Sequence, residues 1–257
     1  MKTSQTLLVS FPRMLDRAVW YGCLGLIAVV IGAASLQAQT VIATYNISTA
    51  NATVSSSVTP TTDPNVTAAN LTTTGVVPGN NLAGTYLWRL WGASTSPDST
   101  KYMTWSVTPT VGNQIDFSGA NATFSLAFGA DSATIHGADT WQLHGSTDNF
   151  ATSDITLGST MTLPFANQGQ QIPETVSLGG LGAQLGTVTF RLYGYNDTKQ
   201  DTLSDSGGLA NAALPGTGGN LIINGTVSAV PEPSSYAAVF GALAFGFVFL
   251  TRRLRKA

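Results

Sequence analysis

The chain is short of the side chains that most often carry chemistry: its 257 residues include one cysteine, two histidines and only 9% charged residues. The cysteine, Cys23, lies near the amino terminus, so the rest of the chain has no disulfide, no thiolate nucleophile and no cysteine-ligated metal site. The histidines, His136 and His144, are eight residues apart and need carboxylates from elsewhere to complete a zinc site. We therefore predict no cofactor and no catalytic metal.

Basic residues are scarce in the interior of the chain. Residues 40–228 hold four basic and eleven acidic side chains, a net charge of −7, whereas the whole chain carries −2. Proteins that bind nucleic acid gather lysine and arginine to contact phosphates, and this interior has no such cluster. We therefore expect no nucleic-acid partner. The solubility of the interior must come from Thr, Ser, Asn, Gln and Gly, a composition typical of extracellular domains.

The first 38 residues have the three parts of a secretory signal peptide. Lys2, Arg13 and Arg17 form a basic region, the apolar stretch CLGLIAVVIGAASL follows, and small residues come next. We predict a signal peptide over 1–38, export through the Sec translocon and cleavage after Ala38 by signal peptidase. An uncleaved transmembrane helix is the alternative, although the apolar stretch is short for a membrane span.

The last 28 residues, VPEPSSYAAVFGALAFGFVFLTRRLRKA (230–257), also have three parts. A Pro-Glu-Pro triplet is followed by 18 uncharged residues, 234–251, and then by a basic cluster. As a helix, this uncharged stretch measures about 27 Å, close to the ~30 Å hydrocarbon core of a bilayer. The basic cluster is expected to stay in the cytoplasm. It consists of Arg252, Arg253, Arg255 and Lys256.

This segment resembles the PEP-CTERM sorting signal of exported proteins in Gram-negative bacteria, which has the same three parts in the same order. The resemblance implies that Pro231, Glu232 and Pro233 are recognised by an exosortase, a membrane-embedded cysteine transpeptidase, and that the basic cluster is a stop-transfer signal. It also implies an association with extracellular polysaccharide and biofilm. On the residues alone, the two prolines bias Glu232 towards an extended form that suits a protease-like cleft. A plain linker before a tail anchor is the alternative.

The body between the two ends, residues 39–229, has no long helical periodicity but many short segments rich in β-branched and aromatic residues. Apolar and polar side chains alternate in several of them, so that Met103, Trp105 and Val107 share one face of a strand. A second sheet is the simplest cover for such an apolar face. We predict an all-β fold, a two-sheet β-sandwich of jelly-roll type. The clearest predicted strands are 41–47, 85–92, 101–109, 121–129, 140–146, 186–195 and 220–230.

Other arrangements of this body stay open. A Greek-key sandwich and a single sheet are alternatives to the jelly roll, and residues 48–81, rich in Thr, Asn, Val, Ala and Pro, fit either a long loop or irregular edge strands. The order of the segments also resembles the β-rich bodies, mostly of unassigned function, that PEP-CTERM proteins commonly carry. The resemblance therefore implies a fold and no chemistry.

The SDSGG segment, 204–208, is similar to the nucleophile segment of chymotrypsin-like serine proteases, but Ser204 and Leu209 stand where that family has Gly and Pro. Neither histidine lies in a matching context, and His144 is expected to face solvent. We therefore predict a Gly-rich surface turn here and no enzymatic activity. A glycosidase with dispersed carboxylates is the alternative, because such pairs cannot be recognised from spacing.

Two groups of side chains are candidates for binding. Trp88 and Trp91 have opposite parity on one strand, so one ring is expected to face outward, where it could stack on a sugar. A calcium ion is the other candidate ligand, with a solvated acidic loop as the default expectation. The carboxylates that could bind calcium are Asp197, Asp201 and Asp205.

The sequence as a whole predicts an exported, non-enzymatic protein with three parts: a signal peptide (1–38), a β-sandwich body (39–229) and a PEP-CTERM sorting signal (230–257). We expect a precursor anchored in the inner membrane, processed by an exosortase and released to the cell surface or extracellular matrix. A structural or adhesive role in exopolysaccharide or biofilm is the predicted function. A carbohydrate-binding module of the same matrix, with extracellular polysaccharide as its partner, is the alternative.

Overall fold

The computed structural model describes most of the predicted body and the C-terminal helix. The described residues are 39–47, 57–79, 84–128, 137–163, 171–197, 206–211, 219–230 and 233–255. The chain divides into two units, Met1–Ala38 and Gln39–Ala257, and the first of them lies outside the described residues. Cleavage after Ala38 therefore stays a prediction.

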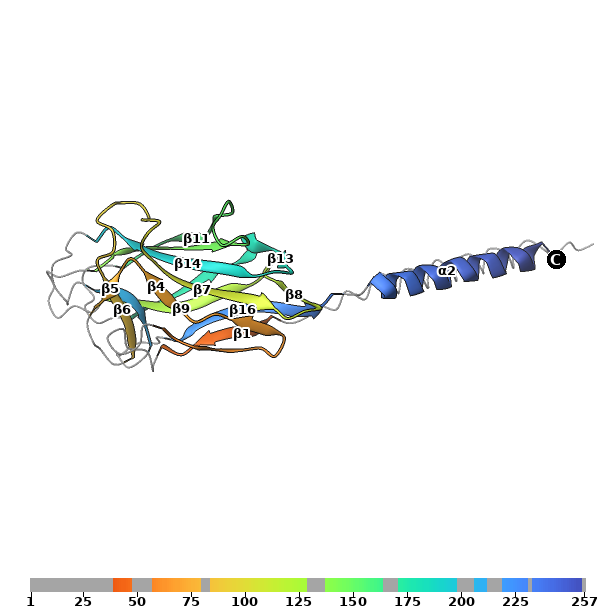
Figure 1. Ribbon diagram of the computed structural model, residues 1–257, viewed down its shortest axis with the longest axis horizontal. Helices are drawn as coiled ribbons and strands as arrows, with labels where there is room; N and C mark the ends of the chain where they lie inside the picture. The colour runs from red at the N-terminus through yellow and green to blue at the C-terminus, as the bar shows by residue number, and fades with distance from the viewer. Residues whose placement is uncertain are drawn as a thin grey trace, which may run out of the picture. The chain divides into compact units, whose positions relative to one another are not determined.

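The described part of the body is built from β-strands in two sheets, as predicted (Figure 1). The strands of the first, ten-stranded sheet are β1 (Thr40–Tyr45), β2 (Pro60–Thr62), β5 (Val77–Pro78), β6 (Thr85–Arg89), β8 (Asn113–Asp116), β9 (Asn121–Phe128), β12 (Gln171–Ser177), β13 (Ala183–Gln184), β15 (Gly207–Ala210) and β16 (Leu221–Ala229). Their order is β13-β8-β16-β9-β15-β6-β5, β1 pairs with β16 and β2, and β12 pairs with β9. All these pairings are antiparallel.

The second sheet has six strands: β3 (Val66–Ala68), β4 (Thr72–Thr74), β7 (Tyr102–Pro109), β10 (Thr140–Ser146), β11 (Ile155–Thr162) and β14 (Val188–Tyr195). Their order is β11-β10-β14-β7, and β3 and β4 both pair with β7 at the edge. Two interpretations were open for residues 48–81, a long loop or irregular edge strands. The described residues 57–79 of this segment form short strands that add to the edges of both sheets. A 3₁₀ turn, η2 (Gly179–Leu181), precedes β13.

The core lies between the two sheets. Trp105 stacks on Phe190 of the neighbouring strand, with ring centroids 5.6 Å apart. Edge-to-face contacts then cross from the second sheet to the first: Phe117 lies 6.2 Å from Phe190 and Tyr45 lies 6.4 Å from Trp105. The predicted alternation is confirmed, because the inward side chains of β7 and β14 are at most 1% exposed. They are Met103, Trp105, Val107, Val188, Phe190 and Leu192.

The position of strand β15 contradicts the prediction made for the SDSGG segment. The SDSGG segment was expected to form a surface turn, but its described part, residues 206–208, is buried and leads into a strand that pairs with β6 and β9. Glycine allows this because neighbouring atoms can approach bare backbone. A Cβ added at Gly207 would meet the ring of Trp141 at 3.1 Å, and one added at Gly208 would meet the Tyr86 carbonyl oxygen at 2.3 Å. Ser206 is fully buried as well, so the predicted surface turn is wrong.

The C-terminal segment contains helix α2 (Pro233–Leu254), which begins at the last proline of the Pro-Glu-Pro triplet and extends through the predicted uncharged stretch. Arg252 and Arg255 are exposed, and Pro231, Glu232 and Lys256 lie outside the described residues. Among the described residues, no helix is long and apolar enough to cross a membrane. The large apolar side chains that α2 exposes are Phe240, Leu243, Phe245, Phe247 and Val248.

Candidate functional site

The two tryptophans predicted to include a sugar-stacking ring are both buried. Trp88 is 4% exposed and Trp91 is fully buried. The alternation that placed one ring outside is broken at Leu90, whose φ of 64° lies in the left-handed region and turns the chain at the end of β6. The Trp91 indole N–H then donates to the Trp88 and Gly207 carbonyls at 2.8 and 3.2 Å. The prediction of an outward ring is wrong, and neither ring offers a face to a ligand.

Of the three predicted calcium ligands, one, Asp197, is among the described residues. Asp197 is fully buried, so the solvated loop expected at this position is wrong. Its backbone N–H donates to the Gly92 carbonyl at 2.9 Å, beside a parallel bridge between Gly92 and Tyr195. Asp201 and Asp205 lie outside the described residues, as does His136. Within the described ranges, no three His, Cys, Asp or Glu side chains are grouped so that they could hold a metal ion.

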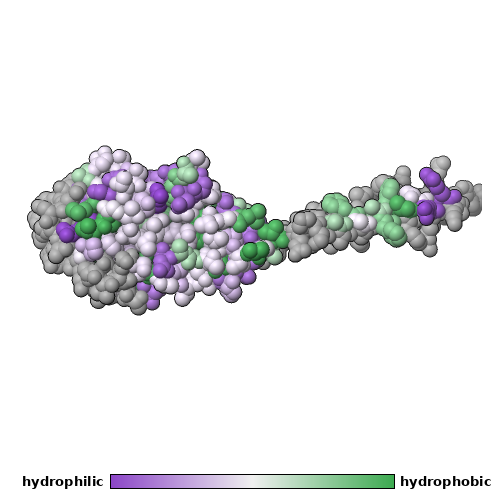
Figure 2. All heavy atoms as spheres, viewed as in Figure 1, coloured by the Kyte–Doolittle hydropathy of each residue, from purple (hydrophilic) through white to green (hydrophobic). Residues whose placement is uncertain are grey.

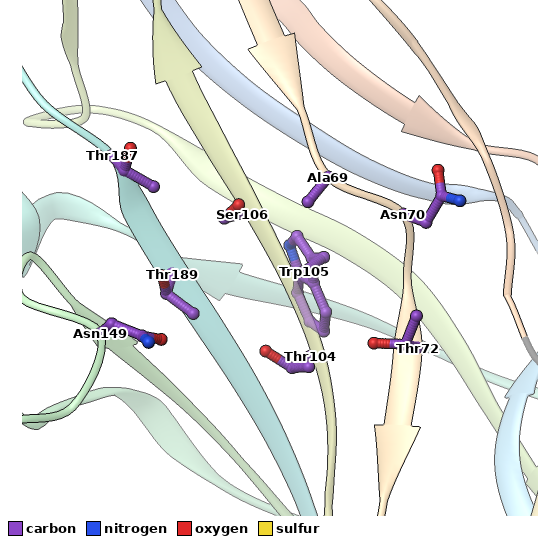
Figure 3. Close-up of a pocket in the computed structure, with 9 residues that line it drawn as sticks. All are labelled: Ala69, Asn70, Thr72, Thr104, Trp105, Ser106, Asn149, Thr187 and Thr189. Atoms are coloured by element: carbon purple, nitrogen blue, oxygen red, sulfur yellow. The ribbon is translucent and has the colours of Figure 1, made fainter.

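The second sheet carries an open groove on its outer face (Figure 3). The groove has a volume of about 490 Å³ and crosses β7, between β14 on one side and the segment that leads into β4 on the other. All but two of its nine lining residues have hydroxyl or amide side chains, and none is charged. The polar lining residues are Asn70, Thr72, Thr104, Ser106, Asn149, Thr187 and Thr189.

Strand alternation explains the polar floor of the groove. Thr104 and Ser106 point away from the core because their neighbours on β7 point into it, and Thr189 does the same on β14. Thr72 lies opposite Thr104 in the sheet, and Thr189 lies opposite Ser106. The hydroxyl of Thr104 donates to the Phe190 carbonyl at 2.9 Å, whereas the other floor residues keep exposed or half-buried hydroxyls. The sequence alternation indicated this polar face without indicating a groove.

A tight loop after β10 supplies one wall of the groove. Asn149, which lines the groove, and Phe150 have φ angles of 57° and 62°, and two successive non-glycine residues in this region cost roughly 1–3 kcal/mol each. Side-chain hydrogen bonds hold this conformation. The Ser146 hydroxyl accepts from the Phe150 N–H at 2.7 Å, and the Asp148 carboxylate accepts from the N–H and hydroxyl of Thr152 at 2.8 and 2.6 Å.

The Asp148 carboxylate gives this loop a predictable pH dependence. The hydrogen bond from the Thr152 hydroxyl is the main cause that lowers the pKa of Asp148 below its ordinary value of about 3.9. A lowered folded-state pKa contributes stability that is present above pH ~4 and is lost as the pH falls further. We expect NMR titration of the Asp148 carboxyl to give a midpoint below that of an unstructured aspartate. In Asp148→Asn the amide signals of Thr152 and Ser153 should move towards unstructured values, and a normal Asp148 titration would contradict this account.

Arg191 lies beside the groove, and its guanidinium lies over two aromatic rings. Its Cζ atom is 4.1 Å from the ring centroids of Tyr102 and of Phe150. Within the described residues, no carboxylate lies within 4.0 Å of Arg191, and its buried Nε–H has no hydrogen-bond partner. Burial raises the pKa of Tyr193, and the hydrogen bond between Tyr193 and Arg191 opposes this shift.

His144 completes the outer face next to this arginine. It lies opposite Arg191 in the β10–β14 pairing, but it is only 9% exposed. Its Nδ1 lies 2.5 Å from the Asp154 carboxylate, its Nε2 lies 3.2 Å from Gln142 Oε1, and its ring packs edge-on against Tyr193. These contacts cover the ring, so the prediction that His144 faces solvent is wrong.

The groove and its rim therefore combine neutral hydrogen-bonding groups with one arginine, and no lining residue of the groove is titratable. Such a surface fits the binding of a hydroxyl-rich ligand better than proton transfer or nucleophilic attack. Neither the protein-family models nor the curated proteins include a match to the chain.

Proposed function

We propose that the chain is an exported, non-enzymatic protein of the cell surface or extracellular matrix, with a structural or adhesive role. In this proposal the two-sheet body, with strands connected as in a jelly roll, is delivered by a PEP-CTERM sorting signal. The observation that carries the proposal is the order of the C-terminal parts: a Pro-Glu-Pro triplet, an uncharged stretch of 18 residues and a basic cluster.

The exposed side chains of α2 support this proposal. Each large apolar side chain kept in water forgoes about 1.5–3 kcal/mol of burial free energy, and α2 exposes five of them, including three phenylalanines. Contiguous exposed apolar surface marks a site that contacts a membrane or another protein. Among the described residues no helix is long and apolar enough to cross a membrane, so the membrane placement in our proposal rests on the uncharged stretch of the sequence, 234–251. That stretch lies in the inner membrane of the precursor, with the basic cluster in the cytoplasm and the triplet outside. An exosortase then removes the segment.

The sorting proposal predicts a defined processing defect. Changing Pro231, Glu232 and Pro233 together to alanine should leave the full-length precursor in the inner-membrane fraction, because the transpeptidase loses its recognition element. The wild-type protein should appear at the surface or in the medium without residues 234–257. Cell fractionation, followed by mass spectrometry of the C-terminal peptide, measures both results.

A matched control distinguishes recognition from a general disturbance of the helix start. Ser234→Ala and Ser235→Ala change the next two residues of the same segment and should leave sorting and tail removal as in the wild type. If the triple-alanine variant is sorted and trimmed normally, the triplet is not a recognition element and the proposal fails. Deleting the exosortase gene of the host should reproduce the defect of the triple variant.

A carbohydrate-binding module of the same matrix is the second candidate, and the groove over β7 favours it. A groove of about 490 Å³ is within the usual range for small-ligand sites, and side chains with hydroxyl and amide groups can both donate to and accept from sugar hydroxyls. Because Trp88 and Trp91 are buried, we assign the candidate carbohydrate site to the outer face of the second sheet instead.

A further inference from the structure

The arginine described above is part of the rim of the groove. Arg191 lies opposite Thr104 across the β7–β14 pairing, and it follows Thr189 by two residues on the same face of β14. Phe150, whose ring centroid lies 4.1 Å from the Arg191 Cζ atom, is the residue next to Asn149. Thr104, Thr189 and Asn149 all line the groove. One cation is therefore placed beside a lining that is otherwise neutral.

Arg191 differs from the other two described cations of the body. The Arg89 Nε–H donates to the Pro78 carbonyl at 3.3 Å, and the Lys101 ammonium donates to the Trp91 carbonyl at 3.1 Å. Among the described residues, the carboxylate found within 4.0 Å of a basic side chain is that of Asp154, which contacts His144, so no described carboxylate lies within 4.0 Å of Arg191. Arg191 therefore has no described carboxylate beside it, although residues 40–228 carry a net charge of −7. The two rings stabilise the cation through their faces without neutralising it.

The two ring contacts also restrict where the guanidinium lies. All five N–H donors of arginine lie in the guanidinium plane, and the Nε–H of Arg191 is buried, so an approaching anion would bond to the terminal N–H groups. A carboxylate can accept two parallel hydrogen bonds from these groups. Because the backbone N–H of Phe150 donates to the Ser146 hydroxyl, the loop that carries this ring is held in place before a ligand arrives. A ligand would therefore lose less affinity to ordering of the site.

We propose that the groove binds an acidic polysaccharide of the uronic-acid type. Its sugar hydroxyls would bond to the hydroxyl and amide side chains of the floor, and one carboxylate would pair with Arg191. A single cation suits a chain with one charge per sugar, whereas a densely charged polyanion would be repelled by the net negative body. This inference rests on the carbohydrate-binding candidate and adds the class of glycan and the residue that selects it.

The test is affinity electrophoresis of the full chain in detergent micelles, with polygalacturonate, neutral dextran or dextran sulfate in the gel. We expect polygalacturonate to retard the wild-type protein and dextran to have little effect. Arg191→Gln should weaken the interaction with polygalacturonate about tenfold or more, because a charge-assisted pair contributes roughly 1.5–3 kcal/mol. Arg89→Gln removes the same charge elsewhere and should bind as the wild type does.

A second variant keeps the inference testable if Arg191→Gln disturbs the fold. Thr189→Val changes the groove floor without changing the charge, and it should also weaken retardation by polygalacturonate. Equal retardation of Arg191→Gln and wild type would overturn the role of the arginine but leave a carbohydrate-binding function in place. Equal binding to dextran sulfate, lost alike in Arg191→Gln and Arg89→Gln, would show unspecific charge attraction and overturn the inference. Failure of every glycan to retard the protein would overturn both the inference and the candidate function.

Discussion

Replacing Trp141 with alanine is expected to lower the free energy of unfolding by about 3–5 kcal/mol, the usual cost of removing a buried aromatic ring. Trp141 belongs to the second sheet and is fully buried, and its indole N–H donates to the Ala138 carbonyl at 2.9 Å. Its ring packs edge-on against Trp91 at 4.9 Å and reaches the backbone of Gly207 in the first sheet. The substitution would open a cavity between the sheets, and urea denaturation measures the loss.

A double-mutant cycle separates the pair interaction from the loss of buried area. Trp91→Ala should also be strongly destabilising, and the double variant should reveal a coupling of about 0.5–1.5 kcal/mol between the two rings. Val111→Ala is the control, because this side chain is fully exposed and its change should stay within ~0.5 kcal/mol. A loss below ~1 kcal/mol in Trp141→Ala would mean that the two sheets are not joined through this ring.

The second large effect is expected for Gly208→Ala, although the change adds only one methyl group. The new Cβ would lie 2.3 Å from the Tyr86 carbonyl oxygen and 2.9 Å from Cε of Met103. The carbonyl belongs to the neighbouring strand β6 and cannot move aside as a side chain can. We expect a loss of about 3 kcal/mol, the upper part of the range for overpacking. For a domain of this size, the corresponding fall in Tm is roughly 6–12 °C.

Gly119→Ala is the matched control for this prediction. A Cβ at Gly119 would have no heavy atom within 4 Å, and its backbone does not have a positive φ. This substitution should be neutral or stabilising by up to ~1 kcal/mol, because alanine reduces the entropy of the unfolded chain. Similar melting temperatures for the two variants would show that β15 does not lie tightly between β6 and β9.

The strands with clear alternation could be predicted from the sequence, and each of the seven predicted segments overlaps one of the described strands. The strands that escaped prediction lack that signal for physical reasons. β15 begins with two glycines, so it has no side-chain pattern where it passes under Trp141 and Met103. β12 contains Pro173, a residue that usually argues against a strand, and β11 turns at Gly158, where φ is 65°.

The candidate site was less accessible to sequence reasoning than the fold. The polar face of β7 followed from alternation, but the groove depends on Asn149 and Phe150, whose left-handed backbone is set by side-chain bonds within the loop. The contacts of the Arg191 guanidinium with two rings join Tyr102, Phe150 and Arg191, three residues far apart in the chain. The alternation of side chains along a strand predicted that Trp88 and Trp91 point to opposite faces. That prediction failed because one left-handed residue, Leu90, reversed the direction of the Trp91 ring. Single backbone conformations of this kind leave no periodic trace in the sequence.

Strand β16 has a mechanical consequence for a protein held by its tail. This strand pairs with β1, β8 and β9, and its end is bonded to the β7–β8 turn through the Val230 N–H and the Gly112 carbonyl, 2.8 Å apart. A pull on the tail would act along the strand, at right angles to its hydrogen bonds, and would load them together instead of one after another. Forced detachment would then be governed by the slow rate of unfolding, so the strand that precedes the proposed sorting segment would also serve as the attachment point for tension.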